Sequence, residues 1–164
     1  MNSEIAALFL GHSTRKLDQM VQCLAVCLPK LTQEQVWQRQ GDHENAIGNL
    51  ILHLCGNMRQ WIMHGVGGAA DVRARDQEFS AMEGDTPEQL LALFESTVAE
   101  AKTIIANVPP ERLTERIYPQ WEWVSVLEAI YQVVGHVQQH VGQIILLTKQ
   151  ICCQDLDLTI PRPR

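Results

Sequence analysis

Apolar residues recur at every third or fourth position in four long stretches of the chain, a spacing typical of helices that bury one face. The predicted helices run about from Asn2 to Leu28, Glu44 to His64, Pro87 to Ile105 and Val124 to Cys152. Pro29 ends the first and Pro109 the third, because proline cannot continue the hydrogen-bond ladder of a helix. Thr86, just before Pro87, is a favoured helix-capping residue. Four amphipathic helices of this length predict an all-α fold, a four-helix bundle.

The connections between these helices differ in length. Residues 29–43 hold one large apolar side chain, Trp37, which we expect to pin this connection to the bundle. Residues 108–123 are expected to include a short extended piece. Residues 65–85 are long for an irregular connection in a compact domain, and when extended they span about 60 Å or more. Such a crossover allows the second and third helices to run parallel.

Length and charge narrow the classes of protein. A chain of 164 residues with 46% hydrophobic and 20% charged residues is typical of one globular domain. We expect that domain to cover residues 1–154, followed by a loosely held, polar tail over residues 155–164. The formal net charge of −6 argues against a nucleic-acid partner, because the small basic group at Arg73 and Arg75 is no phosphate-binding surface.

Hydropathy and cysteine usage bear on the compartment. No apolar run approaches the roughly 20 residues needed to span a bilayer, so no membrane association is expected. The first residues, MNSEIAALFLGHSTRK, lack the basic leader of a secretory signal. The five cysteines are dispersed, without a C-x-x-C pair, as suits a reducing environment. We therefore expect a cytoplasmic protein. Separately, we expect a homodimer formed through helix faces, which is common for bundles of this size.

The segment GHVQQHVGQIILL carries the candidate chemistry. It places His136 and His140 four residues apart, on one face of the last predicted helix. Two such imidazoles can share a metal ion, although two solvated or core histidines would give the same spacing. A third ligand has to come from another helix, and the candidates are His12, His43, His53 and His64. If the second and fourth helices are antiparallel, His53 lies at a compatible depth, and His12 remains possible.

Several familiar metal sites are excluded by the residues beside these histidines. A zinc protease helix needs a glutamate directly after its first histidine, and here that residue is Val137. Di-iron bundles need a glutamate three residues before each histidine, where this chain has Val133, Val137 and Leu50. The chain also lacks a Walker loop, a G-x-S-x-G elbow and a G-x-G-x-x-G loop. A mononuclear site built from imidazoles remains.

Three segments, HENAIGNLILHLCGNMRQW, RARDQEF and GHVQQHVGQI, together resemble the DinB/YfiT-like superfamily of metalloenzymes. The resemblance covers nearly the whole chain, to about Gln150. It implies an up-down-down-up four-helix bundle that holds a divalent metal ion through His53, His136 and His140. Three imidazoles suit zinc, nickel, copper or iron, and we expect zinc or nickel.

Further positions in the same segments have less definite roles. Gln143, after Gly142, is a candidate for orienting a ligand or a water molecule. Asn57 lies one helical turn after His53 and is either a group behind the ligands or a surface amide. We interpret the charged residues of RARDQEF as an ion-pair network that fixes the crossover, with anion binding by an arginine as the alternative.

Characterised relatives in the superfamily include thiol-dependent S-transferases and a mycothiol-dependent maleylpyruvate isomerase. The resemblance therefore implies a metal-dependent transferase that activates a low-molecular-weight thiol toward a small-molecule substrate. One alternative is a metal-dependent hydrolase, and another is a non-enzymatic dimeric bundle that binds a metal or small ligand. No catalytic residue is defined by the sequence; Tyr118, Tyr131 and Gln143 are candidate bases.

Overall fold

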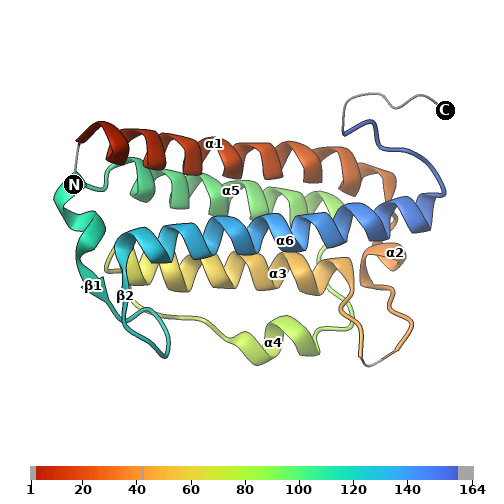
Figure 1. The fold of residues 1–164 in the computed structure, drawn as a ribbon. Helices are drawn as coiled ribbons and strands as arrows, with labels where there is room; N and C mark the ends of the chain where they lie inside the picture. Colours follow the sequence, from red (N-terminus) through yellow and green to blue (C-terminus); the bar gives the residue numbers. More distant parts are fainter. Residues whose placement is uncertain (1–2, 42, 159–164) are drawn as a thin grey trace.

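The computed structural model describes residues 3–41 and 43–158, and this part of the chain is mostly helical. Four long helical segments lie side by side (Figure 1). They are α1 (Ser3–Cys27), α3 (Ile47–Met58) with its π-helical continuation η2 (Arg59–Val66), α5 (Pro87–Ala106) and α6 (Val126–Cys152). The all-α class predicted from the apolar periodicity is confirmed.

The apolar faces of these helices form one continuous core. Its fully buried side chains come from every long segment and include Leu17, Leu24, Ile51, Leu54, Phe94, Ile105, Ile130 and Val137. Each of these residues belongs to a three- or four-residue spacing in the sequence, so the periodicity identifies the buried face of each helix.

Hydrogen-bonded caps fix where two of the long helices begin. The Thr86 hydroxyl accepts from the N–H of Gln89, as the sequence predicts for the start of α5. Ser125 caps α6 in the same way. The last predicted helix begins two residues later than expected, because Val124–Ser125 (β2) pairs antiparallel with Arg116–Ile117 (β1). The first strand of this pair, β1, is the short extended piece expected within residues 108–123, which also hold the 3-10 turn η3 (Pro110–Thr114).

The connection before α3 is more ordered than the sequence indicates. It contains a 3-10 turn, η1 (Leu28–Lys30), and a short helix, α2 (Gln33–Trp37). Trp37 is buried, and its indole N–H donates to the carbonyl oxygen of Asp85 over 3.1 Å, so it does pin this connection. The helix predicted from Glu44 begins instead at Ile47. Gly41–Asp42 is a sequence typical of a turn, and Asp42 lies outside the described residues.

The long connection of residues 65–85 was expected to be irregular, but part of it is helical. It contains α4 (Arg75–Ser80), which Figure 1 shows lying along the side of the molecule next to α3. Six residues are too few to display a helical apolar period, so the pattern could not reveal this helix. Its position brings Glu78 into the interior.

The tail is also held more firmly at its start than predicted. Leu156 is buried, and Lys149 lies 3.3 Å from the Asp155 carboxylate in an ion pair. The rest of the predicted tail, residues 159–164, lies outside the described residues. None of the helices in the described part of the chain has the length and apolar character of a membrane span.

Candidate metal centre

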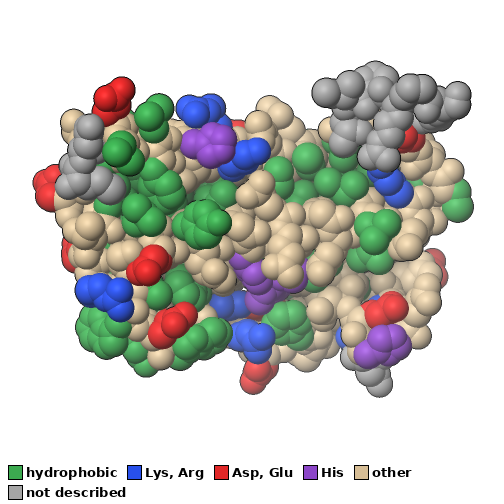
Figure 2. All heavy atoms as spheres, viewed as in Figure 1, with side chains coloured by type: hydrophobic (Ala, Val, Ile, Leu, Met, Phe, Trp, Pro, Cys, Tyr) green, Lys and Arg blue, Asp and Glu red, His purple; other side chains and the backbone are tan. Residues whose placement is uncertain are grey.

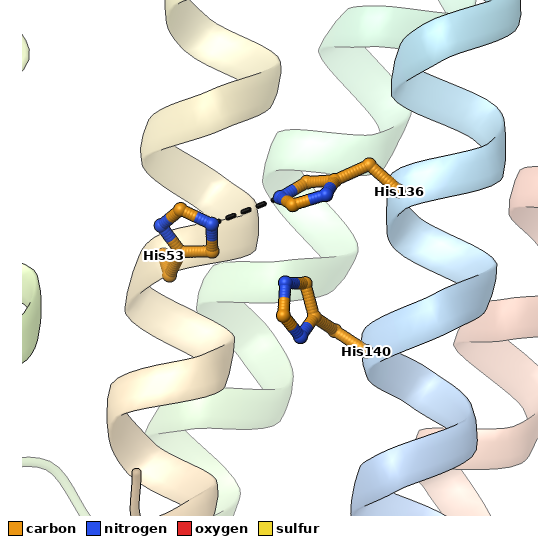
Figure 3. Close-up of side chains that lie close together, drawn as sticks. All are labelled: His53, His136 and His140. Carbon is orange, nitrogen blue, oxygen red and sulfur yellow. Dashed lines mark hydrogen bonds between the residues drawn. The ribbon is translucent and has the colours of Figure 1, made fainter. Parts of the chain in front are cut away.

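Three histidines from two helices meet near the middle of the molecule. His53 comes from α3, and His136 and His140 lie one turn apart on α6. Each ring offers one nitrogen, and these three nitrogens all lie within 4.8 Å of one another. Figure 3 shows the rings turned toward one another across the space between the helices. The structure therefore brings together the three residues named from the sequence.

The rival histidines lie elsewhere. His12 remained a possible ligand from the sequence, but its side chain is exposed, because Leu10, Ser13 and Leu17 take the inward positions of that helix. His43 is exposed, and the His64 ring bonds to the carbonyl oxygen of Ala69 over 2.7 Å. Among the described residues, no other group of histidine, cysteine or carboxylate side chains converges in this way.

The spacing of the ring nitrogens fits a single cation. The Nε2 atoms of His53 and His136 are 2.9 Å apart. Two nitrogens that bind one zinc-like ion at about 2.0–2.1 Å, at angles between 90° and tetrahedral, lie about 2.9–3.4 Å apart. The nitrogens of His53 and His136 therefore have the spacing of two ligands of one divalent transition metal, and the ligand nitrogen of His140 lies within 4.8 Å of both.

A buried carboxylate fixes the orientation of His53. Glu78 Oε2 lies 3.0 Å from His53 Nδ1. Arg73 also lies 3.1 Å from that nitrogen, but its guanidinium cannot accept a hydrogen bond, whereas the carboxylate can. With the Nδ1 hydrogen donated to Glu78, the lone pair of Nε2 faces the other two histidines. Without a metal, the Nε2–H of His136 then donates to His53 Nε2, and a bound cation would replace that hydrogen.

Arg73 in turn holds Glu78 from the other side. Its Nε and Nη2 atoms donate to the two carboxylate oxygens, each over 2.8 Å, and its Nη1 donates to Gln60. Both side chains are almost fully buried. The ion-pair network expected in RARDQEF is thus present between Arg73 and Glu78, but the contact of Glu78 with His53 was not foreseen.

Gln143 orients His140 in the same way. The Nδ1–H of His140 donates to the Gln143 side-chain oxygen over 2.7 Å, which leaves Nε2 of that ring free to face the cluster. This contact agrees with the role suggested for Gln143 from the sequence, that of orienting a ligand. The other two candidate bases, Tyr118 and Tyr131, are exposed, and in the described chain neither is hydrogen-bonded to the cluster.

Comparison with known proteins places the chain in a family. The family described as "Protein of unknown function (DUF1572)" matches residues 4–164. The chain belongs to this family. Among solved structures, the conserved protein of locus from Enterococcus faecalis is similar, with a TM-score of 0.70 and 16% sequence identity over 88% of this chain and 97% of that one. At that identity only the fold is shared. No curated protein is significantly similar to the chain.

The electrostatics of this DUF1572 chain keep the cluster ready for a cation. Burial, together with the neighbouring His140, His53 and Arg73, lowers the pKa of His136 to about 4. Burial also lowers the pKa of His140, against the opposing effect of its hydrogen bond to the Gln143 oxygen. Burial acts to raise the pKa of Glu78, but the hydrogen bonds from Arg73 and His53 outweigh it and the pKa is lowered. Neutral imidazoles beside an ionised carboxylate are the protonation states that a metal site requires.

The cluster is reachable from outside. His136 and His140 are half-buried, and only His53 is fully enclosed. Figure 2 shows histidine side chains at the surface in the middle of one face, between the regions over α6 and α4 and next to Lys or Arg side chains. A separate hollow of about 280 Å³ lies behind Glu78, lined partly by Gly56 and Arg59, and does not include the histidines.

The lowered pKa of His136 predicts how the stability of this protein, when metal-free, depends on pH. In the unfolded chain this imidazole protonates near 6.5, and in the folded chain near 4. Between these values the unfolded state binds more protons, so the free energy of unfolding falls as the pH falls. In chelator-treated protein, urea unfolding should show the highest stability above about pH 6.5 and a decline toward about pH 5. The same measurement on His136→Gln should show a shallower decline, and equal slopes would contradict the prediction.

Proposed function

We propose that His53, His136 and His140 bind one divalent cation, zinc or nickel, and that the chain is a metal-dependent enzyme of the DinB/YfiT-like superfamily. The observation that carries the proposal is the convergence of three imidazole nitrogens. In two of these rings, His53 and His140, Nδ1 is hydrogen-bonded to an acceptor. An incidental group of histidines does not need acceptors placed behind the rings. Metal-binding histidines almost always have them.

The arrangement of the helices supports the superfamily assignment. In Figure 1 the colours show α1 and α6 running in one direction and α3 and α5 in the other. The connection through α4 runs back along the outer side of α3 and joins the two parallel helices. This is the order of an up-down-down-up bundle, which is the topology that we propose.

The reaction that we propose is transfer of a low-molecular-weight thiol to a small electrophilic substrate. A divalent cation held by three neutral imidazoles keeps its positive charge uncompensated, and it would lower the pKa of a bound thiol. Glu78 supplies no charge at the cation itself, because its carboxylate lies behind His53. In the transfer, the thiol proton leaves, the sulfur forms a bond to carbon, and the leaving group departs with its electron pair.

A thiol-binding experiment tests this proposal. Cobalt(II)-loaded protein is titrated with 2-mercaptoethanol, and binding of sulfur to the ion is expected to produce a new thiolate-to-cobalt absorption band. The matched His140→Ala protein should show neither the cobalt spectrum nor the band. If the wild type binds cobalt but its spectrum does not respond to thiol, the transferase proposal is refuted and the cation site stands. Product analysis with and without thiol then separates transfer from hydrolysis.

A further inference from the structure

Two buried asparagines flank His53 on α3, each one helical turn away. Asn49 is fully partnered: its side-chain oxygen accepts from the N–H of Ala46, and its amide group donates to the carbonyl oxygens of Glu78 and Ala81. Asn57 is also more than nine-tenths buried, yet its side-chain oxygen is enclosed and has no hydrogen-bond partner. It is the one such side-chain atom in the part of the chain that the structure describes.

The contacts of neighbouring residues show which way Asn57 faces. Asn49 and Gly56 lie on the side of α3 that faces the crossover, since Asn49 bonds to the backbone of Glu78 and a Cβ at Gly56 would lie 1.9 Å from Glu78 Oε1. At roughly 100° per residue, Asn57 lies about 40° around the helix from His53 in the opposite sense. Asn57 therefore lies on the side of His53 away from the crossover, and α3 also packs against α6, whose His136 ring meets His53. Helical side chains lean toward the N-terminus, so Asn57 leans toward the His53 ring.

A buried, unpaired amide oxygen lowers stability, and a bound water molecule, ion or ligand is one of the ways in which a native chain supplies its partner. We infer that Asn57 is a ligand-binding residue of the three-histidine centre, whose side-chain oxygen accepts a hydrogen bond from an O–H or N–H of the molecule beside the cation. Without substrate, that molecule is water. This inference rests on the proposed cation site and adds a requirement to it: the ligand carries a hydrogen at or next to the atom that the cation holds.

The first test uses the stability of the metal-free protein. Leucine has the branching of asparagine without its polar atoms, so Asn57→Leu removes the unpaired oxygen and should raise the melting temperature by roughly 3 °C. The matched control is Asn49→Leu, which strips partners from three backbone groups and should lower the melting temperature by more than about 5 °C. A residue with a purely structural role would behave like Asn49.

The second test uses cobalt(II)-loaded protein and azide, an anion without hydrogen that displaces water from a cation. Wild-type azide binding has to break the hydrogen bond between that water and Asn57, whereas the Asn57→Leu protein has none to break. The variant should therefore bind azide about fivefold more tightly by absorption titration. Asn57→Ala serves as a second, smaller variant with the same expected direction.

The two tests separate the inference from the proposal beneath it. If cobalt binds to the wild type and to both Asn57 variants with unchanged azide affinity, or if Asn57→Leu destabilises the metal-free protein as much as Asn49→Leu does, the role of Asn57 is refuted while the cation site stands. If the wild type binds no cobalt, the proposed function fails first.

Discussion

Protein in which His136 is replaced by alanine is expected to purify with only traces of zinc or nickel, whereas the wild type carries about one ion per chain. His136 Nε2 lies 2.9 Å from His53 Nε2, and its removal leaves two imidazoles to hold the ion. Loss of a group behind a metal ligand already weakens binding about 10- to 100-fold, so loss of a ligand should exceed 100-fold or so. Elemental analysis of protein purified without an affinity tag measures this directly.

A second measurement gives the same answer from stability. A ligand that binds only the folded state raises the melting temperature, and at about 100 times its Kd it adds about 2.7 kcal/mol. Added zinc or nickel should therefore raise the melting temperature of the wild type but not of His136→Ala. His12→Ala is the matched control, because it removes an exposed histidine from α1 and should retain both the metal and the shift. If wild type and His136→Ala carry the same metal content, the proposed centre is wrong.

Helical geometry narrows the choice of ligands among the histidines, and the resemblance to the DinB/YfiT-like superfamily completes the set of three. His136 and His140 share a face by their spacing, and the depth of His53 in the preceding antiparallel helix follows from the rise per residue. The sequence could not exclude His12 as a ligand, since the packing of neighbouring helices determines whether a histidine beside an apolar stripe turns inward. In the structure Ser13, not His12, takes the inward position on α1.

Glu78 shows what the sequence could not supply. It lies 25 residues after His53, in a helix too short to be recognised from its apolar pattern. Its partners are set by tertiary packing, which places the crossover against α3 close to Gly56. A charged residue in a predicted loop is ordinarily solvated, so nothing local distinguishes Glu78 from Asp76, two residues before it. The ion pair with Arg73 was foreseen because the family segment groups these charges, but the direction in which the carboxylate points was not.

Replacing Glu78 by glutamine should weaken binding of zinc or nickel about 10- to 100-fold, although all three histidines remain. The neutral amide is a poorer acceptor for the Nδ1–H of His53, so the ring is held less firmly and its Nε2 is less basic. The same change leaves the buried Arg73 guanidinium without its counter-charge, which should cost about 3 kcal/mol of unfolding free energy. Competition with a chromophoric chelator measures the affinity, and urea unfolding measures the stability.

Two further variants decide whether the carboxylate acts through its contact with His53 or only through its charge. Asp76→Asn removes one negative charge from the same short helix at an exposed position, and it should change neither the metal affinity nor the stability appreciably. Gly56→Ala keeps every charge but places a methyl group 1.9 Å from the present position of Glu78 Oε1. At that distance the carboxylate has to move away. If contact is what matters, Gly56→Ala weakens metal binding as Glu78→Gln does. An alanine variant with wild-type affinity would show that His53 needs no carboxylate at that position.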